Sequence, residues 1–525
     1  MVFSQLDVNI GIDFGTSFTK VCLWDEDTAS RVVTFAGASL KDSLLLSKVA
    51  ILPDHRLVAG LTESEWQIET RGAEIEIDFI KMRLANFDLE HEGHWFSFTD
   101  ISSYARHDLN QRGCIENLCI FYLARVIQRS KKWFIHKFPN LVKNQEINWS
   151  ANIGVPVRYY NSKALETFQK VLGISFLICN STEADNLEKF TLEDLDRVVR
   201  FLEPNLSKNI PCFAIPEVAA GTYAFTASRS AKEGDYTFID IGSGTVESVF
   251  FSFDRETRRP RIKVLCPYVH PLGIDTLIEG VSKISNIPRI ELEKLLLNGN
   301  SIVDELHSII QQYAKPLTKK DFVAAVAING SLDKESQQYD DLYISQQRLE
   351  SLMDDSEIII NPRNRVLMEL MLWQMAIHLQ TSKVINYKQK KTEIFLCGGG
   401  ARILFYTHSI RATQRAFSQY RATVKPYQFK ELFLPNEDEL SMSDLSRNEF
   451  SRFNIAYGLS LPPSQMPMFT LPDSCHSAQI DGLLRRDVAR LATLIRQETA
   501  TRNSIEVDID WRERPNQALG GRVQA

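Results

Sequence analysis

Several features that would indicate a specialised class of protein are missing from this sequence. The eight cysteines are scattered over 525 residues and no two form a C-x-x-C pair. We therefore expect reduced cysteines rather than a disulfide framework or a zinc knuckle. Lys and Arg number 60 against 66 Asp and Glu, so no excess of positive charge points to a nucleic acid or an anionic membrane as a partner.

Long hydrophobic runs are also missing. The most apolar helical stretch, 366–379 (VLMELMLWQMAIHL), contains Glu369 and Gln374 and is too short to cross a bilayer. No basic segment followed by an apolar core stands near residue 1, so we expect no signal peptide and a cytoplasmic location. The chain is longer than one hydrophobic core usually accommodates, which predicts two or more domains. No low-complexity tract separates them, so we expect the domains to be intertwined.

Apolar patterning predicts strands and helices in alternation, which indicates an α/β fold. The predicted strands are 8–14, 19–24, one ending at Pro156, two within 235–253, and one ending before Gly398. The predicted helices are 116–138, 161–172, 191–204, 216–225, 274–298, 303–313, 346–354, 363–380 and 453–462. A further amphipathic helix, 478–498, lies in a C-terminal segment whose end has the composition of a loosely ordered tail.

Two stretches repeat one short pattern at a spacing close to half the chain. Residues 10–20 read IGIDFGTSFTK, and residues 237–247 read TFIDIGSGTVE. In each, an apolar strand ends in an aspartate, Asp13 or Asp240, and after one apolar residue come a glycine and a hydroxyl residue. A hairpin repeated at half-chain spacing predicts two similar lobes that face one another.

The residue types in these turns are suited to holding phosphate groups. Glycine lets backbone N–H groups approach an anion closely, and hydroxyl groups donate hydrogen bonds to phosphate oxygens. Two carboxylates would repel a phosphate unless a divalent cation such as Mg²⁺, which keeps several of its waters, lay between them. Lys20 offers a positive charge to the same phosphates. The implicated residues are Asp13, Gly15, Thr16, Ser17, Asp240, Gly242, Ser243 and Thr245.

A third glycine-rich turn completes a nucleotide-binding pattern. The segment FLCGGGAR places Gly398, Gly399 and Gly400 between an apolar strand and a helix, where a flat base or a phosphate can lie against the backbone. Arg402 is placed to stack on a base. The sequence has neither a Walker loop nor a dinucleotide fingerprint. The ordered set of three turns therefore predicts a nucleotide cleft of another type.

These segments resemble the motifs of the superfamily that contains actin, DnaK-type heat-shock chaperones and sugar kinases. GIDFGTSFTK is similar to its first phosphate motif, FIDIGSGT to its second, and LCGGGAR to its adenosine motif. PEVAAGTYAF and NIAYGLSL are similar to its two connecting motifs, and all five occur in the superfamily's order. The resemblance implies two actin-like (ribonuclease H-like) lobes with a nucleotide cleft between them. Lobe I would cover 1–230, lobe II 231–462, and a helical extension 463–525.

Within the superfamily, NIGVPVRYYN (152–161) and HPLGIDTLIE (270–279) look most like segments of the ATPase domain of the Hsp70-like chaperones. The resemblance implies a site for ATP or ADP, with Mg²⁺ held through water near Asp13 and Asp240, and a hydrolytic role for Glu217. It implies a catalytic lysine at Lys81, with Arg83 as the alternative. The residues that it implies for nucleotide binding are Gly15, Thr16, Ser17, Phe18, Gly242, Ser243, Gly244, Thr245, Gly398, Gly399, Gly400 and Arg402.

The chain departs from the chaperones at several places. Lys20 has counterparts in actin-like proteins and many sugar kinases but none in the chaperones, so both Lys20 and Lys81 stand as the phosphate lysine. Glu247 stands where the chaperones have an aspartate, which puts a monovalent-ion site in doubt. Extra residues, including a helix, lie within 178–212. Residues 463–525 have neither the strand pattern nor the length of a substrate-binding β-sandwich, so we expect an ATPase without that module.

The sequence thus predicts an ATP hydrolase that switches conformation with its nucleotide and signals to a protein partner. An actin-like filament protein is one alternative, which Lys20 favours. A small-molecule kinase is another, although the sequence offers no convincing aspartate for an acceptor hydroxyl. Nucleotide binding without hydrolysis also stays open, as does the role of 478–498, either in partner binding or in packing on a lobe.

Overall fold

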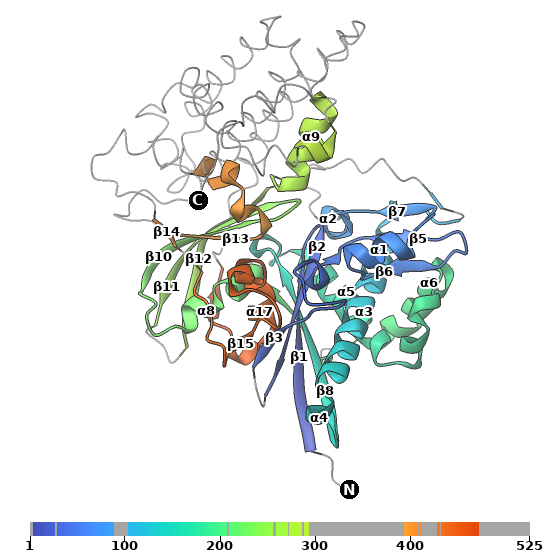
Figure 1. Ribbon diagram of the computed structural model, residues 1–525, viewed down its shortest axis with the longest axis horizontal. Coiled ribbons are helices and arrows are strands. Elements are labelled where there is room, and N and C mark those ends of the chain that lie inside the picture. Colours follow the sequence, from blue (N-terminus) through green and yellow to red (C-terminus); the bar gives the residue numbers. More distant parts are fainter. Residues whose placement is uncertain are drawn as a thin grey trace, which may run out of the picture.

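The computed structural model describes residues 4–292, 393–410 and 428–471, except for short gaps at 27–28, 89–102, 105, 161, 207–208, 256–258, 271, 286–287, 408 and 431. Within these ranges the chain is an α/β protein with two large mixed sheets (Figure 1). The predicted helices at 303–313, 346–354, 363–380 and 478–498 lie outside the described residues. Among the helices described, none is both long enough and apolar enough to cross a membrane.

The first sheet is built around the predicted N-terminal hairpin. Its strand order is β15-β3-β2-β1-β8-β9, with β4 paired to β2. Strands β3, β2 and β1 are antiparallel, whereas β1, β8 and β9 run parallel. The strands are β1 (Ser4–Phe14), β2 (Phe18–Asp25), β3 (Ser30–Val32), β4 (Leu45–Leu46), β8 (Gln145–Val155), β9 (Cys212–Pro216) and β15 (Leu440–Ser441).

The second sheet repeats this arrangement. Its order is β14-β13-β10-β11-β12-β16, in which β12, β11 and β10 are antiparallel while β10, β13 and β14 run parallel. The strands are β10 (Gly234–Ile241), β11 (Val246–Asp254), β12 (Arg261–His270), β13 (Glu393–Cys397), β14 (Gln428–Lys430) and β16 (Met468–Thr470). The repeated sequence pattern is therefore the first hairpin of a repeated five-strand topology.

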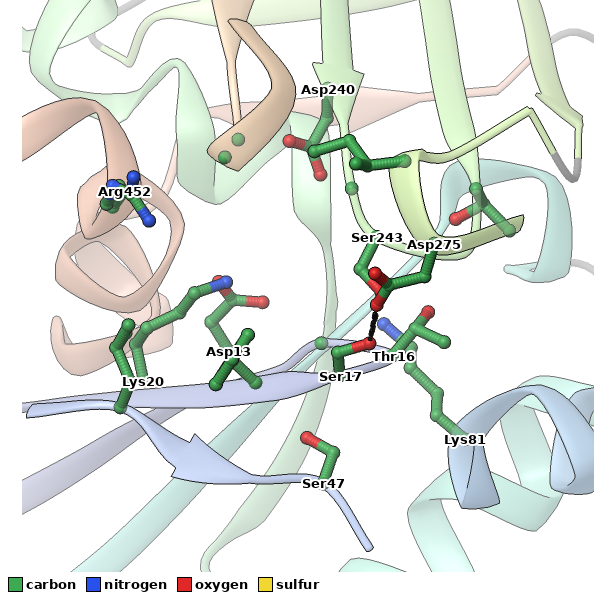
Figure 2. A pocket seen from close by; sticks show the side chains of 18 of the residues that line it. Asp13, Thr16, Ser17, Lys20, Ser47, Lys81, Asp240, Ser243, Asp275 and Arg452 are labelled. Carbon is green, nitrogen blue, oxygen red and sulfur yellow. Dashed lines mark hydrogen bonds and ion pairs between the residues drawn. The ribbon is translucent and has the colours of Figure 1, made fainter. Parts of the chain in front are cut away.

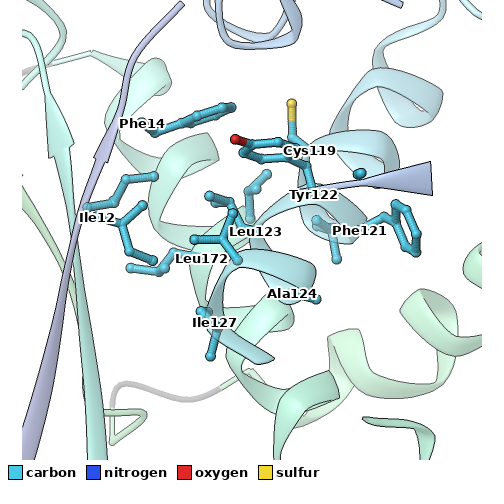
Figure 3. Packing of buried hydrophobic residues seen from close by; sticks show 14 of the residues in the cluster. Ile12, Phe14, Cys119, Phe121, Tyr122, Leu123, Ala124, Ile127 and Leu172 are labelled. Atoms are coloured by element: carbon cyan, nitrogen blue, oxygen red, sulfur yellow. The ribbon is translucent and has the colours of Figure 1, made fainter. Parts of the chain in front are cut away.

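Helices cover the first sheet on the face opposite the second sheet. Helix α3 packs against α5, and its Tyr122 ring stacks on Phe14 of β1 at 5.3 Å between centroids (Figure 3). Helix α6 begins after Thr191, whose side chain forms a capping box with Asp194. These helices are α3 (Arg112–Lys137), α5 (Lys163–Cys179) and α6 (Leu192–Leu202).

Smaller elements complete this half of the protein. A three-stranded sheet has the order β6-β5-β7. Its strands and the adjoining short helices are β5 (Val49–Ile51), β6 (Leu57–Ala59), β7 (Ile75–Ile77), α1 (Glu63–Glu69), α2 (Ile80–Asn86) and α4 (Pro139–Val142). Short 3-10 helices occur at Lys41–Ser43, Val157–Tyr159, Thr182–Lys189, Glu203–Asn205, Gly399–Arg402, Arg447–Arg452 and Pro463–Gln465.

Two connecting segments lie between the sheets. The predicted helix 216–225 is divided at Thr222 into α7 (Glu217–Gly221) and α8 (Tyr223–Ala227), and α8 places Phe225 against the aromatic side chains of the second sheet. Helix α17 (Asn454–Ser460) crosses α7 so closely that a Cβ on Gly458 would lie 2.1 Å from Ala220 O. Glycine is therefore required at this crossing.

Helix α17 packs on the first sheet although it lies between β14 and β16 of the second sheet in the chain. The side-chain amides of Asn9 and Asn152 donate to carbonyl groups at its C-terminal end, where backbone acceptors have no partner within the helix. The segment 231–462 thus supplies elements to both sheets rather than to the second alone. Helix α9 (Ile274–Ser285) covers part of the predicted helix 274–298.

Candidate functional site

A cavity of about 700 Å³ lies between the two halves and receives the turns that follow β1, β10 and β13. All the residues predicted to bind or act on the nucleotide line it, apart from Gly244, Gly400 and Arg83, the alternative to Lys81. Those that line it are Asp13, Gly15, Thr16, Ser17, Phe18, Lys20, Lys81, Glu217, Asp240, Gly242, Ser243, Thr245, Gly398, Gly399 and Arg402. Segments from three parts of the chain therefore meet at one place (Figure 2).

The first turn places an acid and a base side by side. Asp13 and Lys20 are cross-strand partners in the β1–β2 hairpin, and Lys20 Nζ lies 2.9 Å from Asp13 Oδ2. Between them, Gly15 allows the turn to close, because a Cβ there would lie 2.4 Å from Phe18 O. Lys20 is therefore within the cavity, with its charge opposed by Asp13.

The second and third turns meet at Asp240. Gly398 has φ +80°, and a Cβ on it would lie 2.3 Å from Asp240 Oδ1, so both its backbone angle and its surroundings require glycine. Gly244 and Gly400, which do not line the cavity, serve packing instead. Cβ atoms there would lie 2.4 Å from Met82 Sδ and 2.2 Å from Ile241 Cγ2 respectively.

A buried ion pair closes the back of the cavity. Lys81 Nζ lies 2.8 Å from Glu217 Oε1, and both side chains are almost completely buried. Lys81 is held by α2, which begins after Phe79 in a left-handed conformation, and Gly154 leaves room for Glu217. Burial lowers the pKa of Lys81, but the carboxylates of Glu217 and Asp13 outweigh it and raise the pKa overall. Lys81 is therefore charged.

Negative charge exceeds positive charge around this pair. Burial and the nearby carboxylates of Glu217 and Asp13 raise the pKa of Asp240 to about 7. Burial and Glu217 likewise raise the pKa of Glu247, whose Oε1 accepts a hydrogen bond from Val157 N–H at 2.8 Å. Together with Lys20 and Lys81, these four acids leave two negative charges uncompensated when all are ionised.

This surplus of negative charge fits a divalent cation. Asp13 and Asp240 line the same cavity, and burial together with the carboxylates of Glu217 and Asp13 disfavours the ionised form of Asp240, a penalty that a bound cation would relieve. Mg²⁺ binds with one or two protein carboxylates and several waters. Within the part of the chain that the structure describes, no three His, Cys, Asp or Glu side chains are grouped for direct coordination.

The other end of the cavity combines apolar side chains with guanidinium groups. Arg402 donates to Glu449 Oε1 at 3.0 Å and to Asn448 O at 2.7 Å, and Arg452 lies 3.3 Å from Glu449 Oε2. Burial, and more weakly Arg402, lower the pKa of Arg452. The apolar lining here is Ile274, Ile278, Ile403 and Ile455. This end offers aliphatic side chains and guanidinium planes, which suit an aromatic base.

Sequence reasoning missed several residues that line the cavity. Asp275, Arg289, Arg452, Asn454 and Lys48 all do so. A signal for Asp275 was available, because it directly follows the LGI segment that resembles a chaperone motif. Nothing in the sequence marks the others, since they belong to helices and loops brought to the cavity by packing.

Comparison with known proteins does not supply a family. The sequence matches no protein-family model, and a search of curated proteins finds no match.

Proposed function

We propose that the protein binds ATP or ADP with Mg²⁺ in this cavity and hydrolyses ATP. The observation that carries the proposal is the pairing of two like turns. Each follows the first strand of a sheet with the same topology, each contributes an aspartate, a glycine and hydroxyls, and both line one cavity with a third glycine-rich turn. A molecule with several phosphates and an aromatic base matches such a site.

The same repeat supports the proposal of two actin-like lobes. The order and the strand directions of the two sheets agree over five strands each, and α7 and α17 cross between them at a glycine. We place the protein, as a proposal, in the superfamily of actin, Hsp70-like chaperones and sugar kinases, and nearest to the Hsp70-like ATPases.

The residues around the cavity have separable proposed roles. The turns at Gly15–Ser17 and Gly242–Thr245 would hold phosphate oxygens with N–H and hydroxyl groups. Mg²⁺, held through water by Asp13 and Asp240, would neutralise charge on the phosphates. Glu217, fixed by Lys81, would orient a water molecule, and Lys20 and Lys81 would oppose the charge that builds up on the transferred phosphoryl group.

A nucleotide-dependent switch follows from where these residues lie. The first and second turns belong to different halves, so a phosphate that both contact favours the closed arrangement of the halves. A protein partner that binds one arrangement better would then sense the nucleotide. One observation favours the actin-like alternative, namely that Lys20 lies in the cavity beside Asp13, as a phosphate lysine in that branch would.

The proposal is tested by titration calorimetry with Mg·ATP together with phosphate-release assays. We expect Asp13→Ala and Glu217→Gln to slow release by about 100-fold or more, since each removes a group that acts on the reacting phosphate. Glu166→Gln, on the exposed face of α5, is the matched control and should match the native protein. Native turnover in both site variants would overturn the catalytic assignment, and no heat of binding would overturn nucleotide binding.

Filament formation is tested separately. Light scattering and negative-stain imaging with Mg·ATP over a range of protein concentration would show polymers if the actin-like alternative is right. Particles of constant size at all concentrations would exclude filament formation and leave the nucleotide-dependent switch as the proposed function.

A further inference from the structure

One carboxylate lies between the two phosphate-type turns and joins them. Asp275, the second residue of α9, accepts hydrogen bonds on Oδ2 from Ser17 Oγ at 2.5 Å and from Ser243 Oγ at 2.6 Å (Figure 2). Ser17 follows β1 and Ser243 follows β10, and their hydroxyls also contact each other. A single oxygen atom therefore links the two halves of the cavity.

The backbone around Asp275 fixes its position. Gly273 approaches the second turn so closely that a Cβ on it would lie 2.3 Å from Ser243 O. Asp275 N–H donates to Ser243 O at 2.8 Å, and Thr276 Oγ1 donates to Gly244 O at 2.7 Å. The start of α9 is thus bonded to the second turn, and the side chain of Asp275 reaches across to Ser17.

The other oxygen of Asp275 has a cationic partner. Arg289 Nη2 donates to Asp275 Oδ1 at 2.6 Å, and Arg289 lines the same cavity. The carboxylate is thus surrounded by two hydroxyl donors and a guanidinium group. Hydroxyls and guanidinium groups are also the donors that commonly surround a bound phosphate.

We propose that Asp275 takes the place of a phosphate group in the nucleotide-free protein and so sets the affinity of the cavity for phosphates. This inference rests on the proposed function. Each serine hydroxyl has one proton to donate, so a phosphate that accepts from Ser17 and Ser243 must displace the carboxylate. Two anions at this spacing would also repel each other. Displacement also breaks the contact between Arg289 Nη2 and Asp275 Oδ1.

The first test measures binding to the intact chain and its Asp275→Asn and Asp275→Ala variants, with Mg·ATP, tripolyphosphate and adenosine as probes. Binding of ATP and tripolyphosphate should tighten by about tenfold or more in Asp275→Ala, because two hydrogen bonds to a charged acceptor no longer have to be broken. Asp275→Asn should lie between. Adenosine, which has no phosphate, should bind all three proteins equally. Asp254→Asn, which removes an acid paired with Arg261 outside the cavity, is the control.

The second test needs no nucleotide. Amide hydrogen exchange of residues 15–18 and 242–245 should speed up in the apo Asp275→Ala protein, because the carboxylate no longer holds the two turns together. Unchanged exchange, or unchanged or weaker binding of both phosphate probes beside a native protein that binds them, would overturn the role of Asp275. If neither the native protein nor the variants bind ATP, the proposed function fails. Amide hydrogen exchange alone then tests whether Asp275 links the two turns.

Discussion

The acid at the end of β10 gives the sharpest prediction about pH. Burial and the carboxylates of Glu217 and Asp13 raise the pKa of Asp240 from 3.8 to about 7. An acid whose pKa is higher in the folded state binds more protons when folded, so its ionisation opposes folding. The penalty is absent below pH 3.8, grows as the pH rises from about 4 to 7, and is complete above 7.

The magnitude follows from the size of the shift. The rise from 3.8 to about 7, at 1.36 kcal/mol per pKa unit, corresponds to at most about 4 kcal/mol. Asp240 lines the cavity, where water reaches part of the side chain and screens its charge. We therefore expect about 2 kcal/mol. Asp240→Asn keeps the shape and removes the charge, so it should stabilise the protein by that amount at pH 8 and by almost nothing near pH 4.

Urea unfolding of both proteins from pH 4.5 to 8.5, in EDTA and without nucleotide, measures this difference. Asp235→Asn, at the other end of β10, is the control, because Asp235 does not line the cavity. The gap between Asp240→Asn and the native protein should widen with rising pH, and the control should show no such trend. A gap that stays constant or narrows with rising pH would refute the charge balance described for the cavity.

Two further predictions concern stability. Gly398→Ala should lower the free energy of unfolding by more than about 2 kcal/mol, because Gly398 has φ +80° and a Cβ would lie 2.3 Å from Asp240 Oδ1. The control Gly72→Ala, at φ +82° with no atom within 4 Å of its Cβ, should lower it by only about 1 kcal/mol. Equal losses of stability in thermal melts of the two variants would show that the crowding at Gly398 has no effect. Asn9→Ala should lower the free energy of unfolding by about 2 kcal/mol, because Asn9 Nδ2 donates to Ser460 O at 2.7 Å where α17 ends and both groups are buried. An unchanged melting temperature would show that water replaces the amide.

Much of the local structure was predictable from the sequence. The two strands end one residue after Asp13 and Asp240, and the glycine and hydroxyl residues that follow favour tight turns. The capping residue Thr191 marks the start of α6. Short-range patterns of this kind suffice because the chemistry of a turn or a cap lies within a few neighbouring residues.

The sequence could not place residues whose role depends on distant partners. The segment before Asp275 is recognisable in the sequence, but the role of Asp275 becomes visible only when α9 is bonded to the β10–β11 turn and the carboxylate meets Ser17. Gly244 looks like a phosphate-binding glycine, but it packs against Met82 and Thr16.

The sequence by itself determined that there are two matching hairpins with an acid, a glycine and hydroxyls in each, because strand and turn chemistry is local. Only the tertiary structure decided that these hairpins face one cavity, that Lys81 pairs with Glu217 while Lys20 pairs with Asp13, and that Asp275 joins the two turns. The Lys20–Asp13 pair is set by the register of the β1–β2 hairpin, whereas the contacts of Lys81 and Asp275 depend on how α2, α7 and α9 are placed by tertiary packing, which leaves no periodic mark in the sequence.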